Sequence, residues 1–367
     1  MRAISWLVLL VAVGAGPHLP SHQAQRGEAR YRLEVGFDEW LTPSSSTVAR
    51  GSPSEGEGSK PPFIHDVALA PDGSIWYTAQ RANALGRLDP RRGTGEFKEY
   101  PLPTPDSGPH GLVSDAAGNI WYSGNSAGLI GRLNPKTGKV TEYRMPDPAA
   151  KDPHTLAFDR RGILWFTVQL GNFIGRLDPK TDHITLVPLP TPNARPYDIK
   201  INSKDVPFFV EFGTNAIGSI DPKTMKITEY QLGYAGSAVR PRRMAIAPDD
   251  GIYYTDYATG FIEYINLATG FVRTHISPGG PTSRPYAIAM TPDGAVWYCE
   301  TGDPAKNVLV RFDPKTRDTR DMQSWPIPSG GQTVRYMVAD ARGNLWLAES
   351  GAGKIARVRV KWVPMGR

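Results

Sequence analysis

Seven residues at corresponding places along the chain carry the side chains best suited to chemistry. They recur at intervals of 45, 44, 43, 45, 44 and 49 residues and are His65, His110, His154, Tyr197, Arg242, Tyr286 and Arg335. An imidazole can take a proton from a substrate, and a guanidinium can hold a carboxylate or phosphate through two parallel hydrogen bonds. The sequence therefore offers general bases and anion-binding groups, provided that the fold brings these positions together.

A second set of residues lies fourteen positions after the first in every copy. Its members are Ala79, Gly124, Val168, Glu211, Asp256, Glu300 and Glu349. The two sets stand at similar distances on either side of a tight turn, so we expect them to face each other across the mouth of a hairpin. The first three copies then pair His with a small or apolar residue, and the last four pair Tyr or Arg with a carboxylate.

Further charged residues stand two positions before some members of the first set. They are Asp152, Arg195, Arg240 and Arg284. Gathered at one end of a central channel, such residues suit a polar or anionic small molecule or peptide. Two alternatives to ligand binding stay open. In the first, Arg242 with Asp256 and Arg335 with Glu349 only form internal ion pairs. In the second, the three His bind a metal. Equivalent positions on neighbouring repeats are, however, expected to stand too far apart for a shared set of metal ligands.

The elements that must position these residues are short β-strands. Runs of β-branched and aromatic residues are separated by turn sequences such as Pro71-Asp72-Gly73 and Asp178 to Thr181. A repeat of this length with four strands is typical of one propeller blade. The sequence therefore predicts an all-β, seven-bladed β-propeller of four-stranded blades over residues 31–362.

The way in which the ring closes follows from a count of strands. The seventh copy ends at its third strand, and a segment of the outer-strand type lies instead at residues 31–42. We predict that this N-terminal strand completes the last blade, because an unpaired edge would otherwise be exposed. Deletion of residues 31–42 should then destabilise the whole ring.

The remaining segments differ from the repeats. Residues 1–24 combine Arg2 with a short apolar run and small residues, which is typical of a secretory signal peptide and predicts an exported, periplasmic or extracellular protein. No other segment is apolar enough for a transmembrane span, so none is expected in the mature chain. Residues 42–60 are rich in Ser, Gly, Pro and Glu and are interpreted as a mobile loop. Cys299 is the only cysteine, which excludes an internal disulfide.

The charge distribution argues against a nucleic-acid partner. The formal net charge of +6 is mild for 367 residues, and the Lys residues recur mainly at the outer Asp-Pro-Lys-Thr turns rather than along one face. No phosphate-binding loop, CxxC pair, HExxH or GxSxG motif is present. We expect a monomer.

Three motifs of the repeat resemble those of a known family, the streptogramin B lyases (virginiamycin B lyase). They are Pro109 to Leu112, Trp165 to Thr167 and Asn172 to Leu177, and the resemblance extends over roughly residues 31–360. It implies a seven-bladed propeller that opens a cyclic depsipeptide antibiotic by Mg²⁺-dependent elimination at its ester, without adding water. In such a reaction a His removes the proton α to a carbonyl while the metal stabilises the developing enolate.

The residues that the resemblance implies for this reaction are only partly present. The two His positions of the last two blades hold Tyr286 and Arg335, the metal-ligand position before the second of them holds Thr333, and the one after it is Glu349. A shifted arrangement would use His110 and His154 with Asp152, but Val168 then occupies the other ligand position.

Three functional hypotheses follow. The first is a lyase-like enzyme that opens a cyclic ester or lactone, with His110 or His154 as base and Mg²⁺ held by Asp152 or by Glu211, Glu300 and Glu349. The second is a non-catalytic module that binds an anionic small molecule or peptide. Its ligand-binding residues would be His65, Arg195, Tyr197, Arg240, Arg242, Arg284, Tyr286 and Arg335. The third is a protein-interaction scaffold that uses the faces of the propeller and the loop at residues 42–60.

Overall fold

A computed structural model describes residues 31–45, 63–91, 95–233, 238–303, 305–316 and 321–364. The predicted signal peptide and residues 46–60 of the predicted loop lie outside these residues. The chain separates into two compact units, of which the larger is Glu34–Lys361 and the smaller combines Met1–Leu33 with Trp362–Arg367. The site described below belongs to the larger unit.

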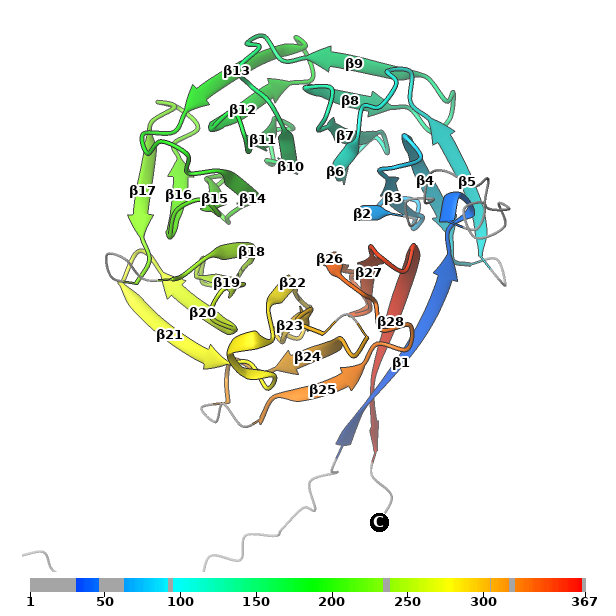
Figure 1. The fold of residues 1–367 in the computed structure, drawn as a ribbon, viewed down its shortest axis with the longest axis vertical. Helices are drawn as coiled ribbons and strands as arrows, with labels where there is room; N and C mark the ends of the chain where they lie inside the picture. The colour runs from blue at the N-terminus through cyan, green and yellow to red at the C-terminus, as the bar shows by residue number, and fades with distance from the viewer. Residues whose placement is uncertain are drawn as a thin grey trace, which may run out of the picture. The chain divides into compact units, whose positions relative to one another are not determined.

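Seven four-stranded antiparallel sheets follow one another around a ring in this unit, which is the predicted β-propeller (Figure 1). Blade 1 consists of β2 (Ile64–Leu69), β3 (Ile75–Ala79), β4 (Ala84–Asp89) and β5 (Glu96–Pro101), and blade 2 consists of β6 (Pro109–Ser114), β7 (Ile120–Gly124), β8 (Leu129–Leu133) and β9 (Val140–Arg144). Blade 3 consists of β10 (Pro153–Phe158), β11 (Leu164–Val168), β12 (Phe173–Asp178) and β13 (His183–Pro188). Blade 4 consists of β14 (Pro196–Ile201), β15 (Pro207–Glu211), β16 (Ala216–Ile220) and β17 (Ile227–Gln231). Blades 5 and 6 are β18 (Pro241–Ile246), β19 (Ile252–Asp256), β20 (Phe261–Asn266) and β21 (Phe271–Ile276); and β22 (Pro285–Met290), β23 (Val296–Glu300), β24 (Val308–Phe312) and β25 (Gln323–Pro326). Blade 7 is β26 (Val334–Ala339), β27 (Leu345–Glu349), β28 (Lys354–Pro364) and β1 (Tyr31–Leu41).

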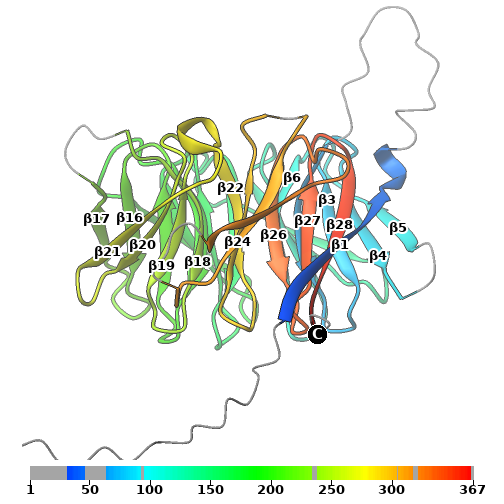
Figure 2. The same cartoon turned by 90° about the horizontal axis from the view of Figure 1, so that it is seen from below.

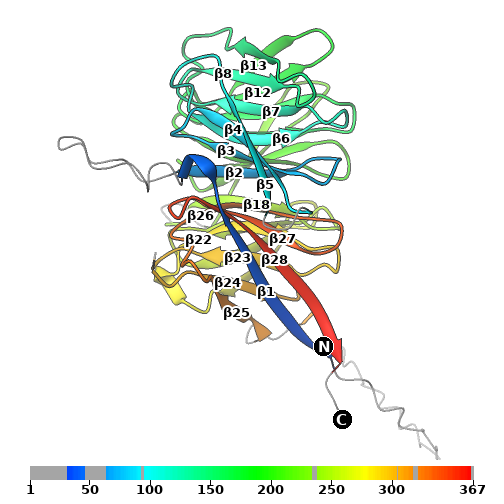
Figure 3. The same cartoon turned by 90° about the vertical axis from the view of Figure 1, so that its right-hand side faces the viewer.

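The predicted ring closure is confirmed, because β1 is the outermost strand of blade 7 and lies beside β28 (Figures 1 and 3). Within the larger unit, Arg357 binds Asp38 at 2.7 Å and Lys354 binds Glu39 at 2.7 Å. Trp40 stacks on Trp346 with ring centroids 6.0 Å apart. The first strand of the propeller is therefore attached to its last blade by side chains as well as by the sheet.

Glycines in the third strand of several blades explain the recurring Ile-Gly-Arg-Leu motif. A Cβ atom built on Gly131 would lie 2.1 Å from the Tyr122 ring, and one on Gly175 would lie 2.1 Å from the Phe166 ring. The aromatic ring of the second strand therefore lies flat over a glycine of the third. Only a residue without a side chain leaves room for this packing.

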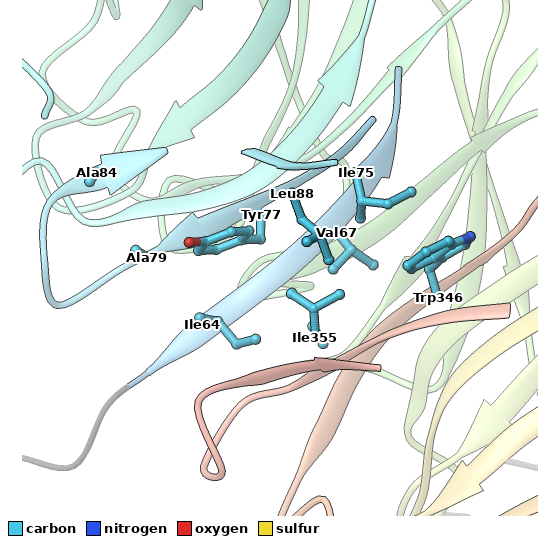
Figure 4. Close-up of a cluster of buried hydrophobic side chains, with 10 residues drawn as sticks. Ile64, Val67, Ile75, Tyr77, Ala79, Ala84, Leu88, Trp346 and Ile355 are labelled. Atoms are coloured by element: carbon cyan, nitrogen blue, oxygen red, sulfur yellow. The ribbon is translucent and has the colours of Figure 1, made fainter. Parts of the chain in front are cut away.

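The hydrophobic core lies between neighbouring blades. Trp76 of blade 1 packs with Leu112 and Tyr122 of blade 2, and Trp346 of blade 7 packs with Ile64 and Val67 of blade 1 (Figure 4). The Trp residues on the second strands of five blades are buried, with at most 3% of their surface exposed: Trp76, Trp121, Trp165, Trp297 and Trp346. Cys299 is buried too. Over the described residues, no helix has the length and apolar character needed to cross a bilayer.

Candidate functional site

The seven predicted positions lie at the starts of the innermost strands, and their side chains meet at the axis of the ring. We call these residues the mouth ring: His65, His110, His154, Tyr197, Arg242, Tyr286 and Arg335. The ring centroids of His65 and His110 are 3.4 Å apart, those of His110 and His154 are 3.9 Å apart, and those of His154 and Tyr197 are 4.0 Å apart. The expectation that His residues of neighbouring blades stand far apart is wrong, because their side chains converge on the axis.

The mouth ring also holds two arginines against aromatic faces. The Arg242 guanidinium carbon lies 4.2 Å from the centroid of Tyr286 and 4.6 Å from that of Phe212. The guanidinium carbon of Arg335 lies 4.7 Å from the centroid of Phe63. Neither arginine forms an ion pair with a carboxylate of the described residues. The mouth therefore carries two positive charges that no described neighbour neutralises.

The carboxylates predicted to face the mouth ring face elsewhere. In blade 5 it is Pro241, not Arg242, that pairs with Asp256, and a β-bulge follows directly in β18. The other blades show the same one-residue shift. Because one residue changes the face of a strand, the predicted Arg242–Asp256 and Arg335–Glu349 ion pairs do not form.

In blades 1, 2, 3 and 5, a hydroxyl two positions after the Trp or its equivalent stabilises this bulge. The Thr78 hydroxyl accepts a hydrogen bond from the Asp66 amide at 3.0 Å and donates one to the His110 carbonyl at 3.0 Å. Thr167 does the same between the Thr155 amide and the Tyr197 carbonyl. Each hydroxyl thus joins its own bulge to the next blade and fixes the residues of the mouth ring.

The four predicted carboxylate ligands are distributed over separate blades and accept hydrogen bonds from local partners. Glu211 accepts from Thr214, Glu300 from Ser277 and the Gly279 amide, and Glu349 from Ser329. Asp152 accepts from Asn125. Burial raises the pKa of Glu349 to about 8 and those of Glu211 and Asp152 to about 7. Within the described residues, the structure does not bring these four together as one set of ligands.

A buried charge network directly behind the mouth ring was not predicted. Arg243, of which 1% is exposed, binds Asp66 at 3.2 Å and Asp198 at 3.3 Å. It also donates to the Thr155 hydroxyl at 3.0 Å and to the Arg335 carbonyl at 3.2 Å. Asp66, Thr155, Asp198 and Arg335 belong to blades 1, 3, 4 and 7. One side chain of blade 5 therefore connects four other blades across the axis.

The three His of the mouth ring are held as neutral imidazoles. Burial, followed by the charges of Arg335, Arg243 and Arg242, lowers the pKa of His65 well below its usual value of 6.5. Burial likewise comes first among the causes that lower the pKa values of His110 and His154. Neutral imidazoles can accept protons or bind metals, but a strongly lowered pKa makes them weak bases.

A cavity of about 840 Å³ opens over blades 4 to 6, on the same face as the mouth ring. Phe212 and Tyr257 line it together with Arg240 and Arg284, and both arginines are exposed. The 3-10 helix η1 (Gly280–Thr282) contributes Pro281 and Thr282 to its wall and projects from one face in Figure 2. Arg242 contacts Phe212 and Tyr257, each with its guanidinium carbon 4.6 Å from the ring centroid. Three predicted arginines thus surround one pair of aromatic rings.

Of the predicted site residues, Arg240 and Arg284 line this cavity, whereas Arg195, Asp152 and the members of the mouth ring do not. Arg195 is exposed at the start of blade 4 and does not line the cavity. Asp152 lines a second cavity of about 560 Å³ over blades 2 and 3, which also contains Arg144 and Leu170.

The residues at the position implied for Mg²⁺ do not suit this ion. Mg²⁺ requires oxygen ligands in octahedral geometry, whereas this position offers Tyr286, Arg335 and the Glu349 carboxyl group. The raised pKa leaves Glu349 mostly uncharged at neutral pH, and Arg335 adds a positive charge.

Comparison with known proteins is consistent with the fold. A family model described as the virginiamycin B lyase family matches residues 53–307. The solved structure of virginiamycin B lyase from Staphylococcus aureus is 25% identical, with a TM-score of 0.74, over 89% of this chain and 99% of that chain. A streptogramin B lyase structure is 26% identical, with a TM-score of 0.74, over 89% of this chain and 98% of that one. A virginiamycin B lyase of Bordetella pertussis is 44% identical over 46 residues, which are 12% of this chain and 14% of that protein.

Proposed function

This chain belongs to the virginiamycin B lyase family, and from that premise we propose that it binds an anionic ligand in the cavity over blades 4 to 6. The ligand is a small molecule or peptide that carries a carboxylate or phosphate on an apolar or aromatic body. We propose further that the protein acts as a monomer. Its place of action is the periplasm or the outside of the cell, as the signal-like sequence of residues 1–24 predicts.

The observation that carries this proposal is the balance of charge at the axis. Behind the mouth ring, Asp66 and Asp198 compensate Arg243 and Lys200. In the mouth ring itself, no carboxylate of the described residues pairs with Arg242 or Arg335. Both arginines are only partly exposed, and charges withdrawn from solvent are normally paired, so two guanidiniums without a carboxylate partner favour an incoming anion.

The cavity beside these arginines supplies the rest of the site. Its volume of about 840 Å³ lies in the range that holds a drug-sized ligand. Arg240 and Arg284 are positioned for the charged group, while Phe212 and Tyr257 offer aromatic faces for the body. A ligand bound here would contact residues of three blades.

The test compares 2-naphthoate with its uncharged analogue 2-naphthamide by titration calorimetry. We expect the carboxylate to bind at least about tenfold more tightly, because a hydrogen bond to a charged group contributes about 1.5–3 kcal/mol. Arg242→Ala and Arg284→Ala should each weaken 2-naphthoate binding by a similar factor. Arg144→Ala, in the cavity over blades 2 and 3, is the matched control and should change nothing. Equal affinity for the two probes, or unchanged affinity in both Arg242→Ala and Arg284→Ala, would refute the proposal.

The ring-opening elimination of a cyclic ester remains a second candidate. It is favoured by the neutral imidazoles of His110 and His154 at the channel mouth, either of which can accept a proton. In the assay, a cyclic depsipeptide is incubated with the protein, with Mg²⁺ or with EDTA, and the product is weighed by mass spectrometry. A linear product of unchanged mass that disappears in His110→Ala or His154→Ala supports elimination, and a product heavier by one water indicates hydrolysis instead.

A further inference from the structure

Among the residues that the structure describes, one group of side chains has donor atoms close enough to share a metal ion. One donor atom each from His65, Asp66 and His110 lie within 4.8 Å of one another. All three residues are buried, and they lie on β2 and β6, the innermost strands of adjacent blades. The group is distinct from the carboxylates predicted as ligands. It belongs to blades 1 and 2, whereas the anion cavity lies over blades 4 to 6.

Two atoms of this group lack hydrogen-bond partners. They are the Asp66 Oδ2 atom and the His110 Nδ1 atom, in residues of which 0% and 6% is exposed. A buried polar atom left without a partner costs about 1–3 kcal/mol, and a bound ion is one way in which a protein satisfies such an atom. Both atoms belong to the same small cluster, so a single bound cation would satisfy both.

We propose that His65, Asp66 and His110 bind one divalent first-row transition-metal ion such as Zn²⁺. Two imidazoles and one carboxylate form a ligand set typical of these ions and leave at least one coordination position for water or an exogenous ligand. Mg²⁺ is not expected to compete, because it prefers an all-oxygen shell. One donor atom from each residue already lies within 4.8 Å of the others, so the three can approach one ion.

The neighbours of the cluster make the proposal specific. Arg243 binds Asp66 through Oδ1, so it orients the carboxylate and leaves Oδ2 for the metal. Arg335 lies over Phe63, whose ring centroid is 5.9 Å from that of His65. The Arg335 charge opposes a nearby cation. Its removal should therefore strengthen metal binding, which no general damage to the fold would do.

The experiment titrates Zn²⁺ into the untagged full chain after EDTA treatment and removal of the chelator, using a colorimetric competitor. We expect one saturable equivalent per chain, unaffected by millimolar Mg²⁺. His110→Asn should weaken binding by at least about 100-fold, because removing a direct ligand exceeds the 10–100-fold effect of outer residues. His154→Asn, a neighbouring imidazole outside the group, should bind as the parent does, and Arg335→Met should bind more tightly.

Absence of a saturable equivalent, or equal affinities in His110→Asn and His154→Asn, would overturn the proposal. If His110→Asn does not fold by circular dichroism, crystals of the parent protein soaked in Zn²⁺ decide the matter. An anomalous peak within bonding distance of His65, Asp66 and His110 supports the site, and a peak elsewhere or none refutes it.

Discussion

Replacement of Arg243 by Met should be among the most destabilising single changes in this propeller. The guanidinium lies 3.2 Å from Asp66 and 3.3 Å from Asp198, and all three side chains are at most 1% exposed. Its loss leaves Asp66 as a buried carboxylate without a cationic partner, whereas Asp198 keeps Lys200 at 3.3 Å and the Met244 amide at 2.9 Å. Breaking a buried ion pair in this way costs about 3–5 kcal/mol.

The assay is urea unfolding followed by tryptophan fluorescence, with the free energy of unfolding taken from the midpoint and slope. Adding Asp66→Asn to Arg243→Met removes the uncompensated charge and should restore more than half of the lost stability. The control is Arg160→Met, because the Arg160–Asp205 pair at 3.0 Å is exposed and should contribute less than about 1 kcal/mol. A loss below about 1 kcal/mol in Arg243→Met, or a double variant less stable than Arg243→Met, would refute the reasoning.

Three further predictions concern stability and can be measured by thermal unfolding. Trp40→Ala removes the stacking on Trp346 that holds the first strand to the last blade. It should lower the free energy of unfolding by about 2–3 kcal/mol, because Trp40 is only partly buried. An unchanged melting temperature would contradict this role of Trp40 in ring closure. Glu349 has a pKa raised to about 8 by burial, from 4.5, so its contribution to stability is present below pH 4.5 and is lost as the pH rises through 8. Glu349→Gln should therefore flatten the decline between pH 4.5 and 8 and be more stable than the parent at pH 9; parallel pH profiles would exclude a neutral Glu349. Gly131→Ala places a methyl group 2.1 Å from the Tyr122 ring and should cost about 1–3 kcal/mol, and a melting temperature equal to that of the parent would show that the ring moves freely.

The architecture could be predicted from the sequence because one pattern is repeated seven times. Turn residues such as Gly73 and Gly294 adopt positive φ angles of 80° and 86° where the sequence indicated hairpins. The pairing of residues 31–41 with the last blade also followed from a simple count of strands. These features depend on local turn chemistry and on periodicity, which the sequence displays directly.

The details of the site depend on a one-residue shift that the sequence pattern did not disclose. Equal distances from the turn suggested that Arg242 faces Asp256, but the bulge after Pro241 turns the two side chains apart. The signal was present in the hydroxyl residues Thr78, Ser123, Thr167 and Thr255, whose side chains accept the amide of the bulged strand. Their recurrence two positions after the Trp or its equivalent marks the bulge in four blades.

The buried network was missed for a related reason. Its charged residues stand one position after members of the mouth ring and are Asp66, Asp198 and Arg243. Charged residues are rare at fully buried strand positions, so opposite charges there in blades 1, 4 and 5 could have indicated a contact across the axis. The convergence of side chains from distant blades depends on the geometry of the closed ring and not on any local pattern.

The closure of blade 7 joins two strands that are synthesised at very different times. Asp38 and its partner Arg357 are 319 residues apart, so the first strand of the ring is made long before the strand that receives it. At usual rates of translation this delay is roughly 15–60 s. During that interval β1 has no partner strand while the intervening blades emerge and fold. Chaperones that shield extended segments are therefore expected to bind β1 until β28 is available to pair with it.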